Sequence, residues 1–597
     1  MSKKLILYGS MAILVLWIGI GSIMQSRNQG DAESRFEHLQ LFLAGEGMGR
    51  SISCYYSEDE SLWYVFLPAD VTGTSLTVQS LGCRYMVLEG KQYQTGDLLG
   101  ELWDGEIKEV SFWNEEGKLL EEGRMKILKS EALPSVYITT ASGGMQYIYE
   151  SKENKEAGNM QIISAEGKLQ ELARLDYIKG RGNTSWDAPK KSFEIRLDQA
   201  ADLFGMGSAR KWVLVANYYD GAYLRNRIGT ELGKAAKMKY TSDSQFVDLY
   251  INGEYAGLYQ VMEKVELAVN RIELREGYLL EFDYYERAME KDFIRLANRQ
   301  PIVVRGQQKV TAQDLAAVQS FIEEMTAALY ADDYRNPETG KHVFDYLDKE
   351  SFAKRYVMEE FLQDMDSGYT SHYMYLDTSD GTMRLYAGPV WDLDNTMGRG
   401  NVREPSGLYA DRHDLKVNNL CRWYARLYAN EEFYQAAVQQ YQTFFKPCLT
   451  WLTQEGIAQW EAEIAASASM DIALWGTERS VFMPGTALAE HMDYLCAYIN
   501  GKIEFLDERW NFAADSRQIW LAERLYELPA MKDQIRAIEE NDGDIVTAEE
   551  EEAGQVTGVW AFIMLYKGYL LFAVMLIFLI VMLGKELMTG RDRRKGM

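Results

Sequence analysis

Two long apolar stretches near the ends of the chain constrain its fold more than any other feature. They run from Leu5 to Met24 and from Gly568 to Gly584, and the first has the length of about 20 residues that a helix needs to cross a bilayer. Lys3 and Lys4 precede the first stretch, and the basic segment GRDRRKGM follows the second. The positive-inside rule then predicts two transmembrane helices, with both termini in the cytoplasm.

The same pattern predicts where the rest of the chain lies. Residues from about 25 to 558 are expected beyond the cell membrane, as one large extracytoplasmic region. A cleaved signal peptide is the competing interpretation of the first stretch. Its apolar core is long and no A-x-A cleavage site follows it, which favours an uncleaved anchor.

The composition indicates a folded and acidic protein. The 597 residues are 47% hydrophobic, and the formal net charge is −26. The hydrophobic fraction excludes a mainly disordered chain. The charge argues against a nucleic-acid partner, because phosphate contacts need clustered Lys and Arg. The five cysteines show no metal-ligand spacing, and the sequence does not decide whether Cys54 and Cys83 form a disulfide.

Changes in pattern along the chain predict its domains. Short alternating segments separated by Gly and Asp turns indicate strands early in the chain, and an Asn252-Gly253 turn between two apolar segments predicts a hairpin further on. From about residue 311, apolar residues recur at helical spacing. The predicted units are a transmembrane anchor (1–30), a β-rich domain (31–130), a main domain (131–530), an acidic linker (531–558), a second transmembrane helix (559–584) and a basic tail (585–597).

One candidate site is the glycine-containing turn in IKGRGNTSWDAPKKSFEIRL, Ile178 to Leu197. A turn of this kind between strands can bring backbone N–H groups close to a phosphate, and Arg181, Lys190 and Lys191 could add positive charge. The spacing alone does not separate this interpretation from an ordinary hairpin turn with solvated lysines.

Two pairs of aspartates form the second candidate site. Asp364 and Asp366 end a predicted helix, where their charge opposes the helix dipole, so a general base or a metal ligand would explain them. Asp392 and Asp394, in VWDLDNTMG, would face the same way on an extended segment and could bind Mg²⁺. The alternative in each case is an ordinary acidic loop. A short predicted hairpin separates the two pairs, which is the layout of a kinase catalytic loop followed by its metal aspartate.

Five blocks, in order, carry a resemblance to a known family: GRGNTSWDAPKKSFEIRL, KWVLVANYYDGAYLRNRIGTELG, VDLYINGEYAGLYQVMEKV, DMDSGYTSHYMYLD and GPVWDLDNTMG. The chain resembles the spore-coat protein H (CotH) kinase family over roughly residues 133 to 520. The resemblance implies an α+β fold class: an atypical protein-kinase-like two-lobed domain. Here that domain would be preceded by the small β-rich domain and flanked by the two transmembrane helices.

The resemblance also implies roles for individual residues. Asp366 would be the catalytic aspartate, Asp392 the principal Mg²⁺ ligand and Asp394 an auxiliary ligand. The GRGN turn, with Arg181 and Asn183, would cover the nucleotide phosphates.

Further residues of the nucleotide site follow from the same blocks. Lys190 or Lys191 would lie near the phosphates, and Glu263, in MEKV (Met262 to Val265), would belong to the hinge that borders the adenine. Typical protein kinases place a metal-binding Asn five residues after the catalytic Asp, and Ser371 stands at that position here.

Together these features predict a membrane-anchored kinase that uses ATP and Mg²⁺ or Mn²⁺. It would phosphorylate Ser or Thr of cell-surface or spore-coat-type proteins. The main alternative is a catalytically weak kinase-like scaffold that acts as a surface binding or adhesion protein, and a weaker one is another nucleotide-dependent transferase acting, for example, on a glycan. The sequence does not predict an oligomeric state.

Overall fold

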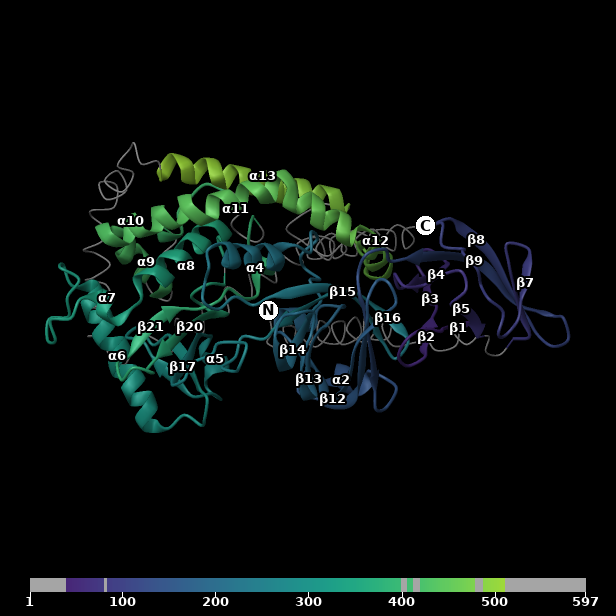
Figure 1. Ribbon diagram of the computed structural model, residues 1–597, viewed down its shortest axis with the longest axis horizontal. Helices are drawn as coiled ribbons and strands as arrows, with labels where there is room; N and C mark the ends of the chain where they lie inside the picture. The colour runs from purple at the N-terminus through teal and green to yellow at the C-terminus, as the bar shows by residue number, and fades with distance from the viewer. Residues whose placement is uncertain are drawn as a thin grey trace, which may run out of the picture.

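The computed structural model describes residues 39–79, 83–364, 366–398, 405–411, 419–477 and 487–510. Three regions of the molecule lie side by side along its long axis (Figure 1). An N-terminal β-rich region lies at one end, a closed β-barrel lies in the middle, and a smaller sheet with most of the helices lies at the other end.

The N-terminal region contains two sheets; several strands, such as β8, alternate buried and more exposed residues, whereas β4 is buried throughout. A three-stranded sheet has the order β2 (Arg50–Ser53), β1 (Gln40–Leu43), β5 (Leu76–Gln79). The other has the order β3 (Tyr55–Ser57), β4 (Leu62–Leu67), β9 (Leu119–Lys129), β8 (Ile107–Trp113), β6 (Tyr85–Leu88), β7 (Lys91–Tyr93). Apolar side chains of both sheets share one core. Cys54 and Cys83 are free thiols, so the disulfide that the sequence left open is not formed.

Seven strands form the closed barrel. Their order is β10 (Ser135–Thr140), β11 (Lys155–Ile163), β12 (Leu169–Arg181), β13 (Ser192–Asp202), β14 (Ser208–Val215), β16 (Glu254–Glu263), β15 (Ser244–Ile251). The parallel pair β10–β15 closes the ring, and the other neighbours are antiparallel.

Short segments connect the barrel strands, and one of them was predicted. Asn252 and Gly253 both have positive φ, 53° and 88°, and join β15 to β16. Such angles suit the two-residue turn of a hairpin, so the predicted hairpin is confirmed. The helices α2 (Gln146–Glu150), α3 (Thr184–Asp187) and α4 (Arg225–Ala235) lie in other connections.

The second sheet has the order β18 (Phe293–Arg295), β19 (Pro301–Gly306), β17 (Gly277–Phe282), β20 (His372–Asp377), β21 (Arg384–Ala387). Its helices are α5 (Tyr285–Ala288), α6 (Ala312–Tyr330), α7 (Val343–Tyr346) and α8 (Lys349–Leu362). Local sequence defines the ends of the long helices: Thr311 and Asp314 form a capping box on α6, and the Asp348 side chain caps α8.

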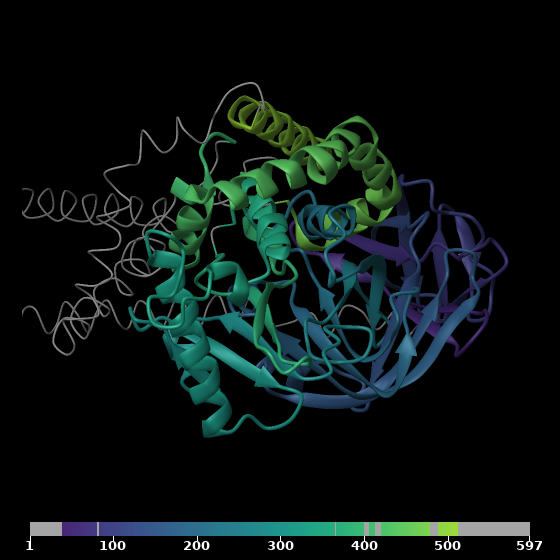
Figure 2. The same ribbon diagram turned by 60° about the vertical axis from the view of Figure 1, so that its left-hand side comes forward.

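The remaining helices cover one side of the molecule, as Figure 2 shows. They are α9 (Asn419–Ala429), α10 (Glu431–Gln440), η4 (Tyr441–Phe445), α11 (Lys446–Trp451), η5 (Leu452–Gly456), α12 (Ile457–Trp475) and α13 (Leu488–Arg509). The stretch from α10 to α12 is continuous, with two wider π-helical turns at η4 and η5. Its far end, α12, packs against β16 of the barrel and β9 of the N-terminal region.

The fold differs from the prediction in one respect. The described part is α+β and has the predicted β-rich region, but none of its helices is long and apolar enough to cross a bilayer. Long helices such as α6 and α13 carry charged residues along their length and bury one side in the core. The predicted spans, Leu5 to Met24 and 559–584, lie outside the described residues. For the described residues the fold class is therefore corrected to a mixed α+β fold with a closed barrel and no transmembrane helix. The predicted localisation in the cell membrane, with both termini cytoplasmic, is corrected to the same extent, because no helix of the described residues supports it.

Candidate active site

A cavity of about 460 Å³ lies beside the end of β12, the β17 strand and the segments that flank the β20–β21 hairpin. Charged side chains of both signs line it. The carboxylates are Glu281, Asp283, Asp366, Asp392 and Asp394, and the cations are Arg181, Arg287, Lys291 and Arg305. The other lining residues are 182–185, Tyr219, Tyr284, Thr370, Ser371, Tyr373, Trp391 and Asn395.

The loop after α8 places Asp366 at this cavity. Gln363 ends the helix in the left-handed conformation, with φ 48°. The Asp364 carboxylate Oδ1 then accepts a hydrogen bond from the Asp366 N–H at 2.9 Å. The Asp366 carbonyl accepts from the N–H groups of Tyr369 and Thr370 at 2.9 and 3.0 Å. The backbone of Asp366 is thus fixed from both sides.

Asp364 itself is buried beneath the cavity. Burial raises the pKa of its carboxyl well above the usual range, and the nearby charges of Glu359 and Asp366 raise it further. Of the two aspartates that end α8, Asp364 therefore supports the loop from a buried position, and Asp366 is the one that lines the cavity.

A buried polar cluster holds this loop against the segment before Asp392. The Arg355 guanidinium donates to the Pro389 carbonyl at 2.8 Å and lies 2.7 Å from Glu359. It also lies 2.9 Å from His372 Nδ1, which Ser367 Oγ contacts at the same distance. Burial, and then the Arg355 charge, lower the pKa of His372 to about 4. His372 is therefore neutral near pH 7 and acts as a structural hydrogen-bond partner.

The helix α4 clamps the segment that carries Asp392 and Asp394. The Leu393 N–H donates to Asn226 Oδ1 at 3.0 Å. The Arg225 side chain donates to the carbonyls of Thr396 and Met397 at 2.9 and 3.3 Å. A Cβ at Gly229 would lie 2.1 Å from Leu393, so only glycine allows this close approach. The motif LRNRIG thus encodes the support of the aspartate segment.

The aspartate segment is a tight turn and not the extended segment that the sequence predicted. Asp392 has φ 62°, and residues Leu393–Asn395 form one turn of 3₁₀ helix, with Leu393 buried. Ser371 is also left-handed, with φ 55°, and its Oγ lies 3.4 Å from Asp392 Oδ2. Left-handed non-glycine residues cost free energy and are retained where surrounding contacts impose them. The turn keeps both carboxylates on the cavity although they are not on a strand.

The carboxylates that line the cavity fit a magnesium ion held together with a phosphate ligand. Mg²⁺ commonly takes only one or two protein carboxylates and completes its shell with phosphate oxygens and water. Asp392 and Asp394 supply two such hard oxygen donors. Within the described ranges no three His, Cys, Asp or Glu side chains come together as a metal site. The geometry thus suits a shared metal–phosphate site better than an all-protein one.

The turn after β12 forms the wall that carries Arg181. The Arg181 guanidinium lies over the Trp391 ring, 5.2 Å from its centroid. Gly182 has φ 98°, and a Cβ there would lie 2.0 Å from Ser185 Oγ. Asn183 Oδ1 accepts a hydrogen bond from Lys152 at 3.1 Å. A cation, a tight glycine turn and two carboxylates of the kind that bind metals therefore line one cavity.

A comparison with protein families agrees with this layout. The family model described as CotH kinase protein matches residues 178–506, more than half of the chain. The chain belongs to the CotH family. No curated protein matched the sequence. The matched region includes the predicted site residues and the supports from α4 and α8.

The CotH region does not bring all of the predicted residues to the cavity. Arg181, Asn183, Asp366, Asp392 and Asp394 line it. The structure places Lys190, Lys191 and Glu263 elsewhere, and these three are not among the lining residues.

Lys191 and Glu263 are each held by other groups. Lys191 donates to the carbonyls of Trp186 and Ala188 at 2.7 and 3.0 Å, so its ammonium group stabilises the turn between β12 and β13. Glu263 pairs with Arg271 at 2.5 Å and accepts from the Asp243 N–H at 2.8 Å.

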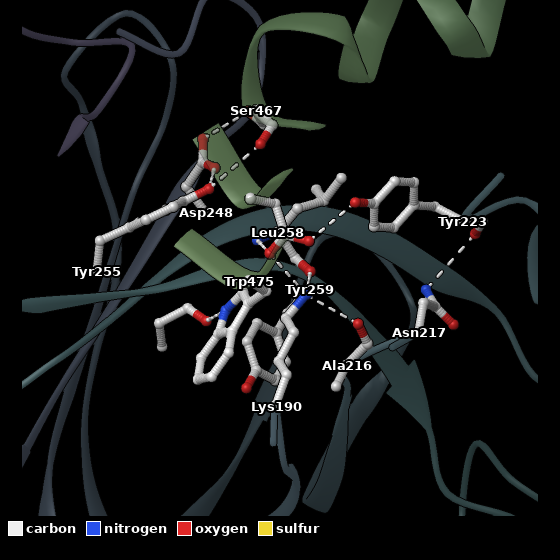
Figure 3. A network of polar contacts seen from close by, with 12 residues as sticks. Lys190, Ala216, Asn217, Tyr223, Asp248, Tyr255, Leu258, Tyr259, Ser467 and Trp475 are labelled. Carbon is white, nitrogen blue, oxygen red and sulfur yellow. Dashed lines mark hydrogen bonds and ion pairs between the residues drawn. The ribbon is translucent and has the colours of Figure 1, made fainter. Parts of the chain in front are cut away.

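Lys190 is fully buried where α12 meets the barrel, in the network of Figure 3. Its ammonium lies 2.8 Å from Asp471 Oδ1 and donates to the carbonyls of Ala216 and Leu258. Asp471 also accepts from the Leu258 N–H and the Tyr223 hydroxyl, each at 2.9 Å. We call this set, with its neighbours Asp248, Tyr255 and Ser467, the α12 junction.

Sequence reasoning missed the cavity residues that come from β17 to β19. Lys291 contacts Asp283 at 2.6 Å, and Arg305 pairs with Glu281. Thr370 Oγ1 also contacts Asp283, at 3.3 Å, and thereby ties the Asp366 loop to this strand. Two acids at alternate positions near the end of an apolar strand, in LLEFD, were the available signal.

Proposed function

We propose that this chain is a protein kinase that transfers the γ-phosphoryl group of ATP to Ser or Thr hydroxyls of a protein, with Mg²⁺ or Mn²⁺ as the metal. The observation that supports it is the convergence on one cavity of Asp366, the Asp392–Asp394 turn and Arg181 from segments far apart in sequence. Cell-surface or spore-coat-type proteins are the substrate class that the family resemblance implies.

In this reaction the acceptor oxygen forms a bond to the γ-phosphorus while the bond to the β–γ bridging oxygen breaks. ADP leaves with the electron pair of that bond. Asp366 accepts the proton of the acceptor hydroxyl through its carboxylate, or orients that hydroxyl for attack. Because its backbone is fixed by Asp364, Tyr369 and Thr370, the carboxylate needs little reorganisation.

Charge stabilisation would come from the metal-binding aspartates and from Arg181, which all line the cavity. Asp392 and Asp394 would hold a metal ion, which supplies positive charge beside the β- and γ-phosphate oxygens when bound. Arg181, held over Trp391, would also contact the phosphates. A preorganised cation in a partly closed site stabilises developing charge more than it would in water.

The test is label transfer from ATP by the purified protein, with Mg²⁺ or Mn²⁺, onto itself and onto a mixture of candidate surface proteins. Asp366→Asn and Asp392→Asn should each reduce the initial rate by about 10²-fold or more. Asp380→Asn is the matched control. Asp380 is an exposed carboxylate in the turn between β20 and β21, and it accepts local hydrogen bonds from the N–H and hydroxyl of Thr382. Transfer that survives both active-site substitutions would show that the chemistry lies elsewhere.

A catalytically weak scaffold is the second candidate, and one observation favours it. Ser371 stands where kinases carry a metal-binding Asn, and its hydroxyl contacts Asp392 at 3.4 Å. A scaffold would bind nucleotide and metal, or neither, without any transfer. Nucleotide binding that is unaffected by Asp366→Asn and accompanied by no labelled product would favour this alternative.

A further inference from the structure

The resemblance assigned Met262 to Val265 to the adenine-bordering hinge, and the first two residues of this segment have their backbone occupied by the barrel. Met262 pairs with Val213 of β14 on one side and Ser244 of β15 on the other. Glu263 pairs with Trp212, and its N–H donates to the Asp243 carbonyl at 3.0 Å. Because the barrel is closed, β16 has a neighbour on both sides here and offers no free edge to a base.

The side chains of this segment are occupied as well. Met262 and Val265 are buried in one apolar cluster with Trp391 and Tyr373, two residues that line the cavity. Lys264 pairs with Glu194 at 2.5 Å, and Glu263 pairs with Arg271. Core side chains thus fill the space between this segment and the cavity.

The side chains that line the cavity are largely charged and suit a charged ligand. None of its described lining residues comes from Met262 to Val265, whereas cations from β12, α5 and β19 and the metal-type carboxylates do line it. Half-buried aromatic side chains such as Tyr219 also line it. An aromatic face can stack on any base without reading its edge.

From this arrangement, and resting on the proposed function, we propose that the site selects its phosphoryl donor by the metal-bound polyphosphate and not by the base. The donor class is then any metal-complexed nucleoside triphosphate, and purines with altered edges are accepted. With each donor the same bond breaks, between the γ-phosphorus and the β–γ bridging oxygen, and the nucleoside diphosphate leaves.

The expected discrimination between ATP and GTP depends on which protein groups contact the base. Donors and acceptors aimed at a base edge discriminate on the order of 10- to 100-fold for each well-formed pair of hydrogen bonds. Stacking and phosphate contacts discriminate little between ATP and GTP. We therefore expect the two nucleotides to differ by less than about tenfold in kcat/KM and in Kd, and N⁶-benzyl-ATP to bind within the same range.

The experiment compares ATP, GTP and N⁶-benzyl-ATP with the full chain and Mg²⁺, by calorimetric binding and by transfer of the γ-phosphoryl group. Glu263→Gln and Glu266→Gln form a matched pair, since each removes one carboxylate that pairs with a cation, Arg271 or Lys211. Neither substitution should change the ATP-to-GTP ratio.

The outcomes separate this inference from the proposed function. Equal binding of ATP and GTP without transfer from either would sustain the donor inference and overturn the proposed kinase activity. A preference for ATP over GTP above about tenfold would overturn the donor inference, and so would an ATP-to-GTP ratio that Glu263→Gln changes and Glu266→Gln does not. In either case, transfer of the γ-phosphoryl group would still support the proposed kinase activity. Absence of binding by all three nucleotides would overturn both.

Discussion

The cavity and the α12 junction each take one cation from the same sequence block, Arg181 and Lys190, yet the two regions use charge in opposite ways. Arg181 is partly exposed and lies over Trp391, and several carboxylates that could bind a metal ion line the same cavity. Lys190, a few residues later, is fully buried and contacts Asp471 and two carbonyls. Charge in the cavity can interact with a ligand, whereas charge in the junction is used within the fold.

The difference comes from the neighbours that each side chain meets and not from strand position, because Arg181 pairs with Ser192 and so lies at the same end of the β12–β13 pair as Lys190. Arg181 ends β12 at the rim of the barrel, and Lys190 comes just before β13, where α12 approaches the barrel. Gly257 makes that approach possible: a Cβ there would lie 2.2 Å from Asp471 Oδ1. The comparison predicts that substitutions in the junction reduce stability and substitutions in the cavity reduce activity.

The largest expected effect is on stability, from Lys190→Met. This change leaves the Asp471 carboxylate buried without its cation, which typically costs about 3–5 kcal/mol of the free energy of unfolding. Urea denaturation followed by far-UV circular dichroism measures it. The double variant Lys190→Met with Asp471→Asn removes the buried charge as well and should recover part of the loss. A Lys190→Met protein of unchanged stability and reduced nucleotide affinity would place Lys190 in the cavity and reverse the comparison.

Arg181→Met should show the opposite pattern. Loss of one preorganised cation from the cavity should lower the rate of phosphoryl transfer by about 10²-fold. The free energy of unfolding should change by less than about 0.5 kcal/mol, because the side chain is partly exposed and methionine still packs on Trp391. Initial rates with labelled ATP and urea denaturation of the same preparation provide both numbers. Arg196→Met is a suitable control, since Arg196 is another partly exposed barrel arginine and pairs with Asp176.

These contrasts also show how far the sequence could predict the site. Short local patterns made Asp366, Asp392 and Arg181 candidates: a helix end, a D-x-D and a glycine turn. These patterns left ordinary loops as alternatives, and the ordered family blocks assigned the roles. The burial of Lys190 was not predictable in this way, because its partner Asp471 lies on a helix far along the chain, outside the blocks that carry the resemblance.

The same limit applies to the fold. The Asn252–Gly253 hairpin follows from local turn chemistry, whereas closure of the barrel depends on the parallel pairing of β10 with β15, which is distant in sequence. The role of α4 in holding Leu393 depends on tertiary contacts of Asn226 and Gly229 that helical periodicity does not indicate.

The junction should also give the protein a pH-dependent stability in the acidic range. Burial raises the pKa of Asp248 from 3.8 to about 6, although hydrogen bonds from Ser130, Ser467 and Tyr255 oppose the rise. The folded state therefore holds this proton more tightly than the unfolded state. Protonated Asp248 therefore contributes about 2–3 kcal/mol to the free energy of unfolding below about pH 4, and this contribution is lost as the pH rises to about 6.

Asp248→Asn tests this contribution, because the amide stays neutral at every pH. The difference in the free energy of unfolding between Asp248→Asn and the wild type should grow in favour of the variant between pH 4 and 6. Equilibrium denaturation at several pH values measures the slope. A difference that stays constant over this range would show that Asp248 does not titrate there. Cavity variants such as Arg181→Met should not change the slope.

The smallest effect is expected from Ser371→Asn, which places the usual kinase residue in the cavity. Ser371 has φ 55°, and asparagine tolerates the left-handed region better than serine, so the free energy of unfolding should rise by about 0.5–1 kcal/mol. Ser371→Ala removes the contact with Asp392 and the polar side chain, and should lower it by a similar amount. If the amide also reaches a second metal ion, transfer should increase and require less Mn²⁺ or Mg²⁺ for half-maximal rate. A loss of more than about 1 kcal/mol on Ser371→Asn would contradict the comparison, because the fold would then depend on a cavity residue as strongly as on the junction.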